Sequence, residues 1–204
     1  ATVDMLAVQN LGKFAFNNCT SLAAVDMPAV KNLGNFAFER CRSLTAVDMP
    51  AVKTVSDRAF DGCKMLTAVN MPAVQTVKFC AFNGCASLPV VDMPAVKTVG
   101  AGAFANCTSL TNVDMLAVDT VNAGAFLYCT SLTDVSMPIV ETIFFPANEM
   151  ADAHPAFYGC AAITRVVCPP GLVKHFLHSA AGPVLVHIPS AIDVDGWGAK
   201  RATP

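Results

Sequence analysis

The sequence is short of charge and has no long apolar run. Only 14% of its 204 residues are Asp, Glu, Lys or Arg, and the formal net charge is −2. This balance gives no reason to expect nucleic acid or an anionic membrane surface as a partner. Although 54% of the residues are hydrophobic, polar residues interrupt them every few positions. No run approaches the roughly 18 apolar residues of a membrane span, so we expect none.

Motifs for catalysis are also missing. There is no G-x-S-x-G, no H-E-x-x-H and no glycine-rich phosphate loop. Most cysteines occupy positions that the pattern described below predicts to be buried, which does not suit an activated nucleophile. The spacing from Cys168 to His175 and His178 matches no closed set of zinc ligands. We therefore expect no enzymatic activity, no cofactor and no metal site.

What the sequence has instead is a 22-residue period. The segment from Leu44 to Met65, LTAVDMPAVKTVSDRAFDGCKM, is one repeat. One column of valines comprises Val3, Val25, Val47, Val69, Val91, Val113 and Val135. A column of phenylalanines comprises Phe16, Phe38, Phe60, Phe82, Phe104, Phe126 and Phe157, each three residues before a cysteine. A fixed period in the twenties is the signature of a solenoid, whose coils bury these columns by stacking.

Each part of the repeat predicts a local structure. From Ala46 to Met49, apolar and polar residues alternate, as in a strand with one buried face. Val52 to Val55 indicates a second extended segment, and Ala59 to Cys63 a single helical or 3₁₀ turn. Gly34 and Gly100 follow the second segment in their own repeats, and we expect them in a turn with positive φ.

The repeat resembles a known family. The segment from Leu88 to Leu110, LPVVDMPAVKTVGAGAFANCTSL, is similar to the leucine-rich repeats of the BspA-like (Treponema-type) class, whose pattern is L-x-x-I-x-I-P, V-x-x-I-G and A-F-x-x-C. The resemblance covers residues 1 to about 168. It implies a right-handed leucine-rich-repeat solenoid of the α/β class, rich in β-structure, with strands and a short helical turn in each coil. It also implies a surface or secreted binding protein or adhesin.

The expected organisation is a solenoid over residues 1–168 and an irregular last coil with a C-terminal cap over 169–204. Nine additional residues near 144–154 stretch the last interval between phenylalanines. The insertion carries Phe144, Phe145 and Met150 and is interpreted either as a binding loop or as a local cover over the core. Val186 falls in a strand position of a last repeat. Because the first coil has no polar cap, we expect a fragment or mature form that could self-associate end to end.

The most regular exposed feature is acidic. The residue between the Val and Met columns is Asp in most repeats, and these side chains should project from one sheet face. The flanking column changes from alanine to polar residues toward the C-terminus. The candidate binding face comprises Asp26, Asp48, Asn70, Asp92, Asp114, Asn112, Asp134 and Arg165. This face is either an acidic stripe that binds a basic partner or a solvated stripe that keeps the sheet soluble, aided by Lys31, Lys53 and Lys97. A Ca²⁺ site is less suited to it, because Ca²⁺ needs converging oxygens rather than a row.

The nine cysteines are expected to be free. Seven of them form a ladder, one after each column phenylalanine, and an odd set of stacked side chains that point the same way cannot pair completely. They are interpreted as buried thiols that act as small hydrophobic residues. Cys168 occupies a Met position and should also be buried, whereas Cys80 replaces a variable residue and should be exposed.

Two functions remain open. The first is a non-enzymatic repeat module that binds a protein or a glycan, as a cell-surface or adhesin-type domain would. The second is a structural spacer, or a self-assembling segment, of a longer repeat protein. The binding residues of the first are the acidic face and the loop at Phe144, Phe145 and Met150.

Overall fold

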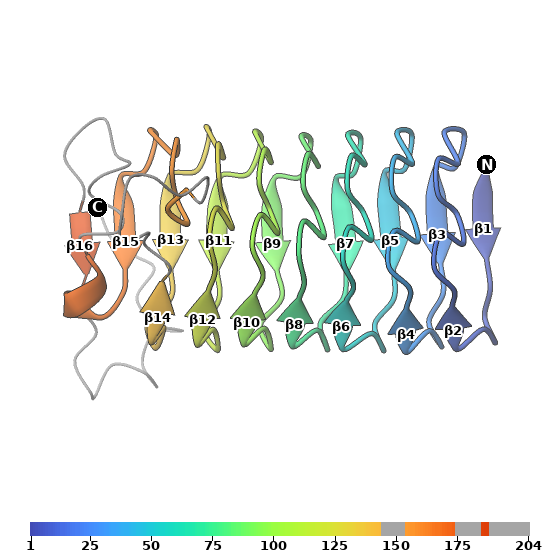
Figure 1. Cartoon of the computed structure of the whole chain (residues 1–204), viewed down its shortest axis with the longest axis horizontal. Coiled ribbons are helices and arrows are strands. Elements are labelled where there is room, and N and C mark those ends of the chain that lie inside the picture. Colours follow the sequence, from blue (N-terminus) through green and yellow to red (C-terminus); the bar gives the residue numbers. More distant parts are fainter. Residues whose placement is uncertain (144–153, 174–184, 188–204) are drawn as a thin grey trace, which may run out of the picture.

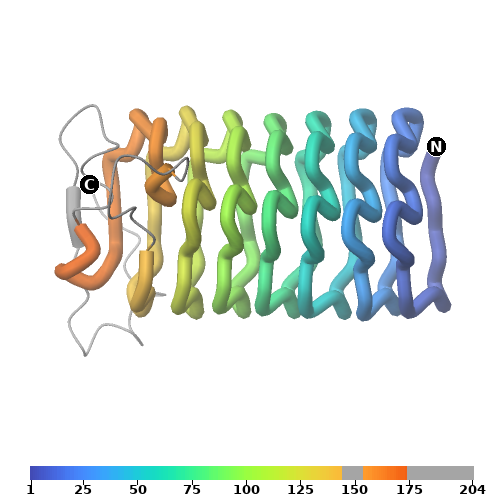
Figure 2. The backbone as a smooth tube through the Cα atoms, in the orientation of Figure 1, coloured from blue at the N-terminus to red at the C-terminus, as the bar shows by residue number. Residues whose placement is uncertain are grey.

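A computed structural model describes residues 1–143, 154–173 and 185–187. The chain winds into a solenoid whose coils stack along the long axis of the molecule, with β1 at one end and β15 and β16 at the other (Figures 1 and 2). Each regular coil contributes a three-residue strand, a two-residue strand and a turn. The predicted leucine-rich-repeat solenoid is confirmed.

The three-residue strands form one side of the solenoid, here called the first wall. They are β1 (Thr2–Asp4), β3 (Ala24–Asp26), β5 (Ala46–Asp48), β7 (Ala68–Asn70), β9 (Val90–Asp92), β11 (Asn112–Asp114), β13 (Asp134–Ser136), β15 (Arg165–Val167) and β16 (Leu185–His187). All pair in parallel, with equivalent residues of successive coils opposite one another, such as Val25 and Val47. The predicted last strand is confirmed, because Val186 lies opposite Val166.

The two-residue strands form the second wall. They are β2 (Asn10–Leu11), β4 (Asn32–Leu33), β6 (Thr54–Val55), β8 (Thr76–Val77), β10 (Thr98–Val99), β12 (Thr120–Val121) and β14 (Thr142–Ile143). A 3₁₀ helix, η1 (Pro170–Leu172), follows β15. Figure 1 shows the two walls as separate rows of strands. In β5 and β6 the valine points inward, and the polar or small residues point out.

Each wall is interrupted once, at a different level of the stack. The first wall divides into the sheets β1-β3-β5-β7 and β9-β11-β13-β15-β16. The second wall divides into β2-β4 and β6-β8-β10-β12-β14. Because the two interruptions lie at different coil junctions, one wall is continuous wherever the other is broken.

Pro89 explains the interruption of the first wall. In the neighbouring coils a threonine precedes the strand and binds the preceding coil twice. The Thr67 amide and hydroxyl donate to the Thr45 carbonyl at 3.0 and 3.1 Å. Thr111 makes the same two bonds to the Pro89 carbonyl, at 3.0 and 3.2 Å. Proline has neither an N–H nor a hydroxyl, so it cannot bind the Thr67 carbonyl in this way.

The core is a set of stacked columns. The rings from Phe16 to Phe157 stack on one another with centroids 5.0 to 5.4 Å apart, and those from Phe38 onward are fully buried. Each ladder thiol from Cys41 onward donates to the carbonyl of a phenylalanine, as Cys63 does to Phe38 at 3.1 Å. The predicted burial of the repeated apolar positions is confirmed.

The cysteines are all free, as predicted. Burial raises the pKa of the Cys41 thiol to about 11 and that of Cys107 to about 12, so these thiols stay protonated at neutral pH. Cys168 is buried as expected. Two members differ from the prediction: Cys19 is exposed, because its coil has a neighbour on one side only in this chain, and Cys80 is half-buried rather than exposed.

The segment from Ala59 to Cys63 makes one hydrogen-bonded turn rather than a helix. The Cys63 amide donates to the Phe60 carbonyl at 3.1 Å, and the Phe60 amide donates to the Ala81 carbonyl of the next coil at 2.8 Å. Arg58 precedes this turn and Gly62 lies within it, with φ values of 52° and 73°. These left-handed residues stop the turn from continuing and redirect its amides toward the next coil.

The prediction of positive φ at Gly34 and Gly100 was wrong. The left-handed positions lie two residues later, at Phe36 (φ 60°) and Gly102 (φ 62°). At Gly34 and Gly100 the backbones of adjacent coils come close together. A Cβ on Gly100 would lie 2.7 Å from the carbonyl carbon of Lys78, so these glycines serve close approach instead.

Several predictions lie outside the described residues. These are the loop with Phe144, Phe145 and Met150, the histidines His175 and His178, and most of the C-terminal cap predicted over 169–204. Within the part of the chain that the structure describes, no helix is long and apolar enough to cross a membrane.

Candidate functional site

A shallow groove runs along the outer face of the first wall. Its volume is about 410 Å³, and it crosses β1, β3, β5 and β7. The residues that line it are Thr2, Ala24, Val25, Asp26, Ala46, Val47, Asp48, Ala68, Val69 and Asn70. The groove exists because one outward column consists of alanines, whose methyl groups leave room beside the longer side chains of the next column. We call it the acidic groove.

The acidic groove places carboxylates of adjacent coils next to one another. Asp26 and Asp48 lie directly opposite in register on β3 and β5. Like charges in this arrangement repel each other, so the pair favours a cation or a hydrogen-bond donor beside it. At the next position the Asn70 side-chain amide donates to Asp48 Oδ1 at 2.8 Å, which provides one such donor and ends the run of charge.

Toward the C-terminal coils the predicted binding face continues on the second sheet of the first wall and includes an ion pair. Asp92 and Asp114 also lie in register, on β9 and β11, but they belong to the sheet beyond the interruption at Pro89. Arg165 pairs with Asp134 through Nε and Oδ1 at 2.8 Å. Asp134 therefore has a cationic partner within the protein.

The structure thus divides the predicted site residues into three groups. Asp26, Asp48 and Asn70 line the acidic groove. Asp92, Asp114 and Asn112 lie on the other sheet of the first wall, and the Arg165–Asp134 pair lies on later strands of that same sheet. Among the residues that the structure describes, no group of three or more His, Cys, Asp or Glu side chains could hold a metal ion.

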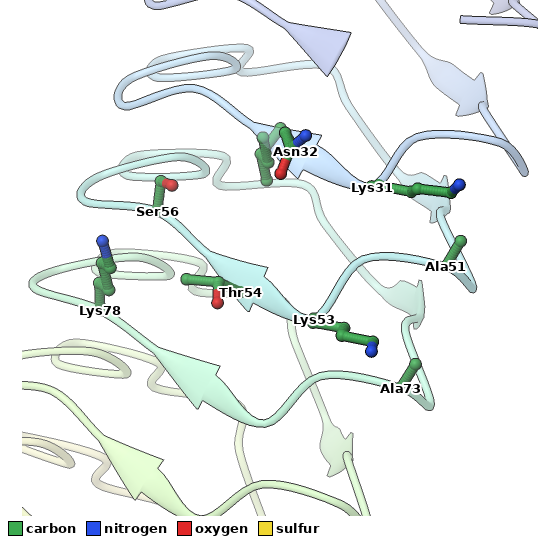
Figure 3. Close-up of a pocket in the computed structure, with 9 residues that line it drawn as sticks. Lys31, Asn32, Ala51, Lys53, Thr54, Ser56, Ala73 and Lys78 are labelled. Atoms are coloured by element: carbon green, nitrogen blue, oxygen red, sulfur yellow. The ribbon is translucent and has the colours of Figure 1, made fainter. Parts of the chain in front are cut away.

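Sequence reasoning missed a larger groove on the second wall. Its volume is about 790 Å³, and Lys31, Lys53 and Lys78 line it together with polar and small residues (Figure 3). Two of these lysines are 22 residues apart, and this spacing was the available signal. The third comes from a different position of the repeat, so column-by-column inspection does not place it with the others.

Aromatic rings are also exposed beside the second wall. Phe14 and Phe79 each expose 47% of their surface. Phe14 stacks on Phe36 with centroids 4.9 Å apart, and Lys13 lies over both rings. The guanidinium of Arg58 lies 5.5 Å from the Phe79 centroid. This edge of the molecule is therefore both aromatic and cationic.

Comparison with protein families matches residues 5–74 and 53–150 to the BspA-type leucine-rich repeat region, in six copies. A comparison with curated proteins gave no match.

Solved structures share the fold. A leucine-rich repeat protein of Treponema pallidum is 23% identical, with a TM-score of 0.66 over 93% of this chain and 86% of that one. A leucine-rich cell-surface protein of Faecalibacterium prausnitzii is 22% identical, with a TM-score of 0.62 over 82% of this chain and 63% of that one. A leucine-rich repeat protein of Bacteroides ovatus is 23% identical, with a TM-score of 0.58 over 93% and 42%. The chain therefore spans less than two thirds of two of these proteins.

Proposed function

Because the chain belongs to the BspA-type leucine-rich repeat family, we propose that it is a non-enzymatic binding module that holds its ligand on the first wall. The observation that carries the proposal is the acidic groove, which combines a floor of small side chains with a row of carboxylates. The ligand that fits this chemistry is an extended segment of a protein that presents lysine or arginine side chains.

The floor favours an extended ligand. Ala24, Ala46 and Ala68 follow one another on adjacent strands in register, so no bulky side chain interrupts the groove across three coils. A ligand backbone can approach the wall closely along this line. Its cationic side chains would then meet Asp26 and Asp48, and charge-assisted hydrogen bonds of this kind are stronger than neutral ones.

The similarity to a leucine-rich cell-surface protein of Faecalibacterium prausnitzii supports a role in recognition outside the cell. This chain spans 63% of that protein. The alternative is a structural spacer within a longer repeat protein, and it predicts that the acidic groove binds nothing.

The proposal is tested by surface plasmon resonance with purified extracellular-matrix and cell-surface proteins, together with lysine- and arginine-rich peptides. We expect saturable binding that weakens with salt. The double variant Asp26→Asn/Asp48→Asn should weaken it about tenfold, since two charge-assisted contacts are lost.

The matched control is Asp119→Asn/Glu141→Gln, which removes the same charge at positions that precede second-wall strands. This control should leave the affinity nearly unchanged. Equal weakening by both variants would mean that binding follows overall charge and not the acidic groove. No saturable binding to any probe would favour the spacer.

A further inference from the structure

The second wall carries a groove of opposite charge to the acidic groove, here called the basic groove. Its lining residues include Lys31, Asn32, Lys53, Thr54, Ser56 and Lys78. Its charged lining residues are all cationic. The basic groove also crosses the interruption of the second wall, because β4 pairs with β2 whereas β6 pairs with β8.

The lysines stand on both rims of the basic groove. Lys31 and Lys53 project in the same direction from the start of β4 and β6, and Lys78 stands at the opposite side, beyond Ser56 (Figure 3). The side chains of Asn32 and Thr54 lie between these rims. The Asn32 side-chain amide donates to Asn10 Oδ1, so the neutral groups offered to a ligand are the Asn32 side-chain oxygen and the Thr54 hydroxyl. A ligand in the groove would therefore meet positive charge on two sides and polar groups beneath.

These charges are not neutralised within the described part of the chain. The ion pairs found there are Arg58–Asp61 and Arg165–Asp134, and neither involves a lysine of the basic groove. Asp57, which follows Ser56, has both carboxylate oxygens engaged: Oδ1 accepts the Phe79 amide at 3.2 Å, and Oδ2 accepts the Asn35 side-chain amide at 3.4 Å.

Stacked lysines without a counter-charge repel each other, just as stacked carboxylates do. Lys31 and Lys53 occupy equivalent positions of adjacent coils, and the Phe38 and Phe60 rings of these coils are 5.3 Å apart. A ligand with negative charges repeated at a similar interval would relieve this repulsion at both lysines. The coil spacing is close to the length of one sugar residue in an extended polysaccharide.

The aromatic edge points to a sugar rather than to a simple anion. Phe79 follows Lys78 directly, exposes 47% of its surface and carries the Arg58 guanidinium on its ring. An exposed ring beside cations offers an apolar surface against which the C–H face of a pyranose ring can pack. Nucleic acids also stack on aromatic rings, but their electrostatic footprint is a strongly basic domain, whereas this chain has a net charge of −2.

We propose that the basic groove binds an acidic polysaccharide, a linear chain that bears sulfate or carboxylate groups. Lys31, Lys53 and Lys78 would bind the anionic groups, Asn32 and Thr54 the hydroxyls, and Phe79 a sugar face. This site is separate from the acidic groove, so either site can exist without the other.

The test is isothermal titration of the whole chain with a heparin hexasaccharide at low salt. We expect saturable binding that the variant Lys31→Gln/Lys53→Gln/Lys78→Gln weakens about tenfold or more. The matched control, Arg42→Gln/Lys64→Gln/Lys97→Gln, removes the same charge at exposed positions outside the groove. It should weaken binding by less than about threefold. Thermal unfolding of both variants checks that they remain folded.

Four further arms identify the ligand and the site. Phe79→Ser should weaken binding of the hexasaccharide, and inorganic sulfate should compete only weakly. The double variant Asp26→Asn/Asp48→Asn should bind the hexasaccharide as the unaltered chain does, which distinguishes this site from the proposed function. Equal losses in the groove variant and its control, or no saturable binding, would overturn the proposal. Tighter binding of a single-stranded oligonucleotide through the same lysines would overturn the assignment to a polysaccharide.

Discussion

Replacement of Phe82 by alanine tests whether the stacked phenylalanines hold the solenoid together. The Phe82 ring is fully buried. It lies between Phe60 and Phe104, with centroid distances of 5.2 and 5.3 Å. The change removes a whole ring from the middle of the stack. Hydrogen bonds to neighbouring coils fix the backbone around it, such as the one that the Phe82 amide donates to the Ala103 carbonyl at 2.7 Å.

The magnitude follows from this geometry. A buried phenylalanine replaced by alanine typically lowers the free energy of unfolding by about 3–5 kcal/mol, the cavity included. The second wall is continuous through the coils of Phe60, Phe82 and Phe104, and the first wall also joins the coils of Phe60 and Phe82. Because this pairing holds the coils at their spacing, the cavity has little freedom to collapse. We therefore expect a value in the upper half of that range.

Phe16→Ala is the matched control. The Phe16 side chain is only partly buried, and it stacks on one ring, Phe38, at 5.1 Å. Its replacement leaves no enclosed cavity, so the loss should be about 1–2 kcal/mol, in proportion to the apolar surface involved. Both proteins have lost the same atoms, and only the packing differs.

Urea unfolding followed by circular dichroism measures both losses. The unfolding slope should be the same in all three proteins if the solenoid unfolds as one unit. Equal losses for Phe82→Ala and Phe16→Ala, or a loss below about 1 kcal/mol for the former, would contradict the view that central rings carry more stability than terminal ones. A smaller slope for Phe82→Ala alone would instead indicate that the altered solenoid unfolds in two parts.

Two further predictions concern the backbone and the thiols. Pro89→Thr supplies the missing amide and hydroxyl donors to the Thr67 carbonyl, and it should raise the free energy of unfolding by roughly 0.5–2 kcal/mol after loss of the proline's rigidity. The control Pro94→Thr, at an exposed site, should give no gain. Equal effects of the two variants would contradict the explanation of the interruption. Burial raises the pKa of Cys107 from its ordinary 9.0 to about 12, so the unfolded chain loses this proton at a lower pH than the folded chain. The contribution of the protonated thiol to the free energy of unfolding is therefore fully present below pH 9 and falls as the pH rises toward 12. The free energy of unfolding should fall by up to about 1.4 kcal/mol per pH unit for a thiol this deeply buried. In urea unfolding between pH 8 and 11, Cys107→Ala should show a shallower fall of this free energy with pH than the unaltered chain. An equal fall in both proteins would contradict the role of Cys107.

The solenoid and its core could be predicted because a repeat must bury the same residues in every coil. Val47, Met49 and Phe60 recur at fixed intervals, and stacking gives each of them the same neighbours. The left-handed positions could not be predicted in the same way. Phe36 and Arg58 adopt positive φ although their side chains disfavour it, because hydrogen bonds to the next coil fix the turn. The glycines at 34 and 100 were assigned from local preference and belong instead to a contact between coils.

The candidate site was predicted in part. Alternation along the strand placed Asp26 and Asp48 on the outer face, and the structure agrees. The bond from Asn70 to Asp48 and the pair of Arg165 with Asp134 depend on how side chains extend between coils, which the period does not specify. The basic groove combines two columns of the repeat with a strand interruption, and neither column is distinctive alone.

The uniform stacking of the phenylalanines has a consequence for the gene. Because every ring meets its neighbour at nearly the same distance, recombination between two repeats of the coding sequence would delete or duplicate whole coils without creating an unfamiliar contact in the phenylalanine stack. Phe38 would then stack on Phe82 much as it now stacks on Phe60. Where the change falls within the coils of a groove, it would lengthen or shorten that groove by whole coils, so the extent of a binding surface could evolve independently of the chemistry of its residues.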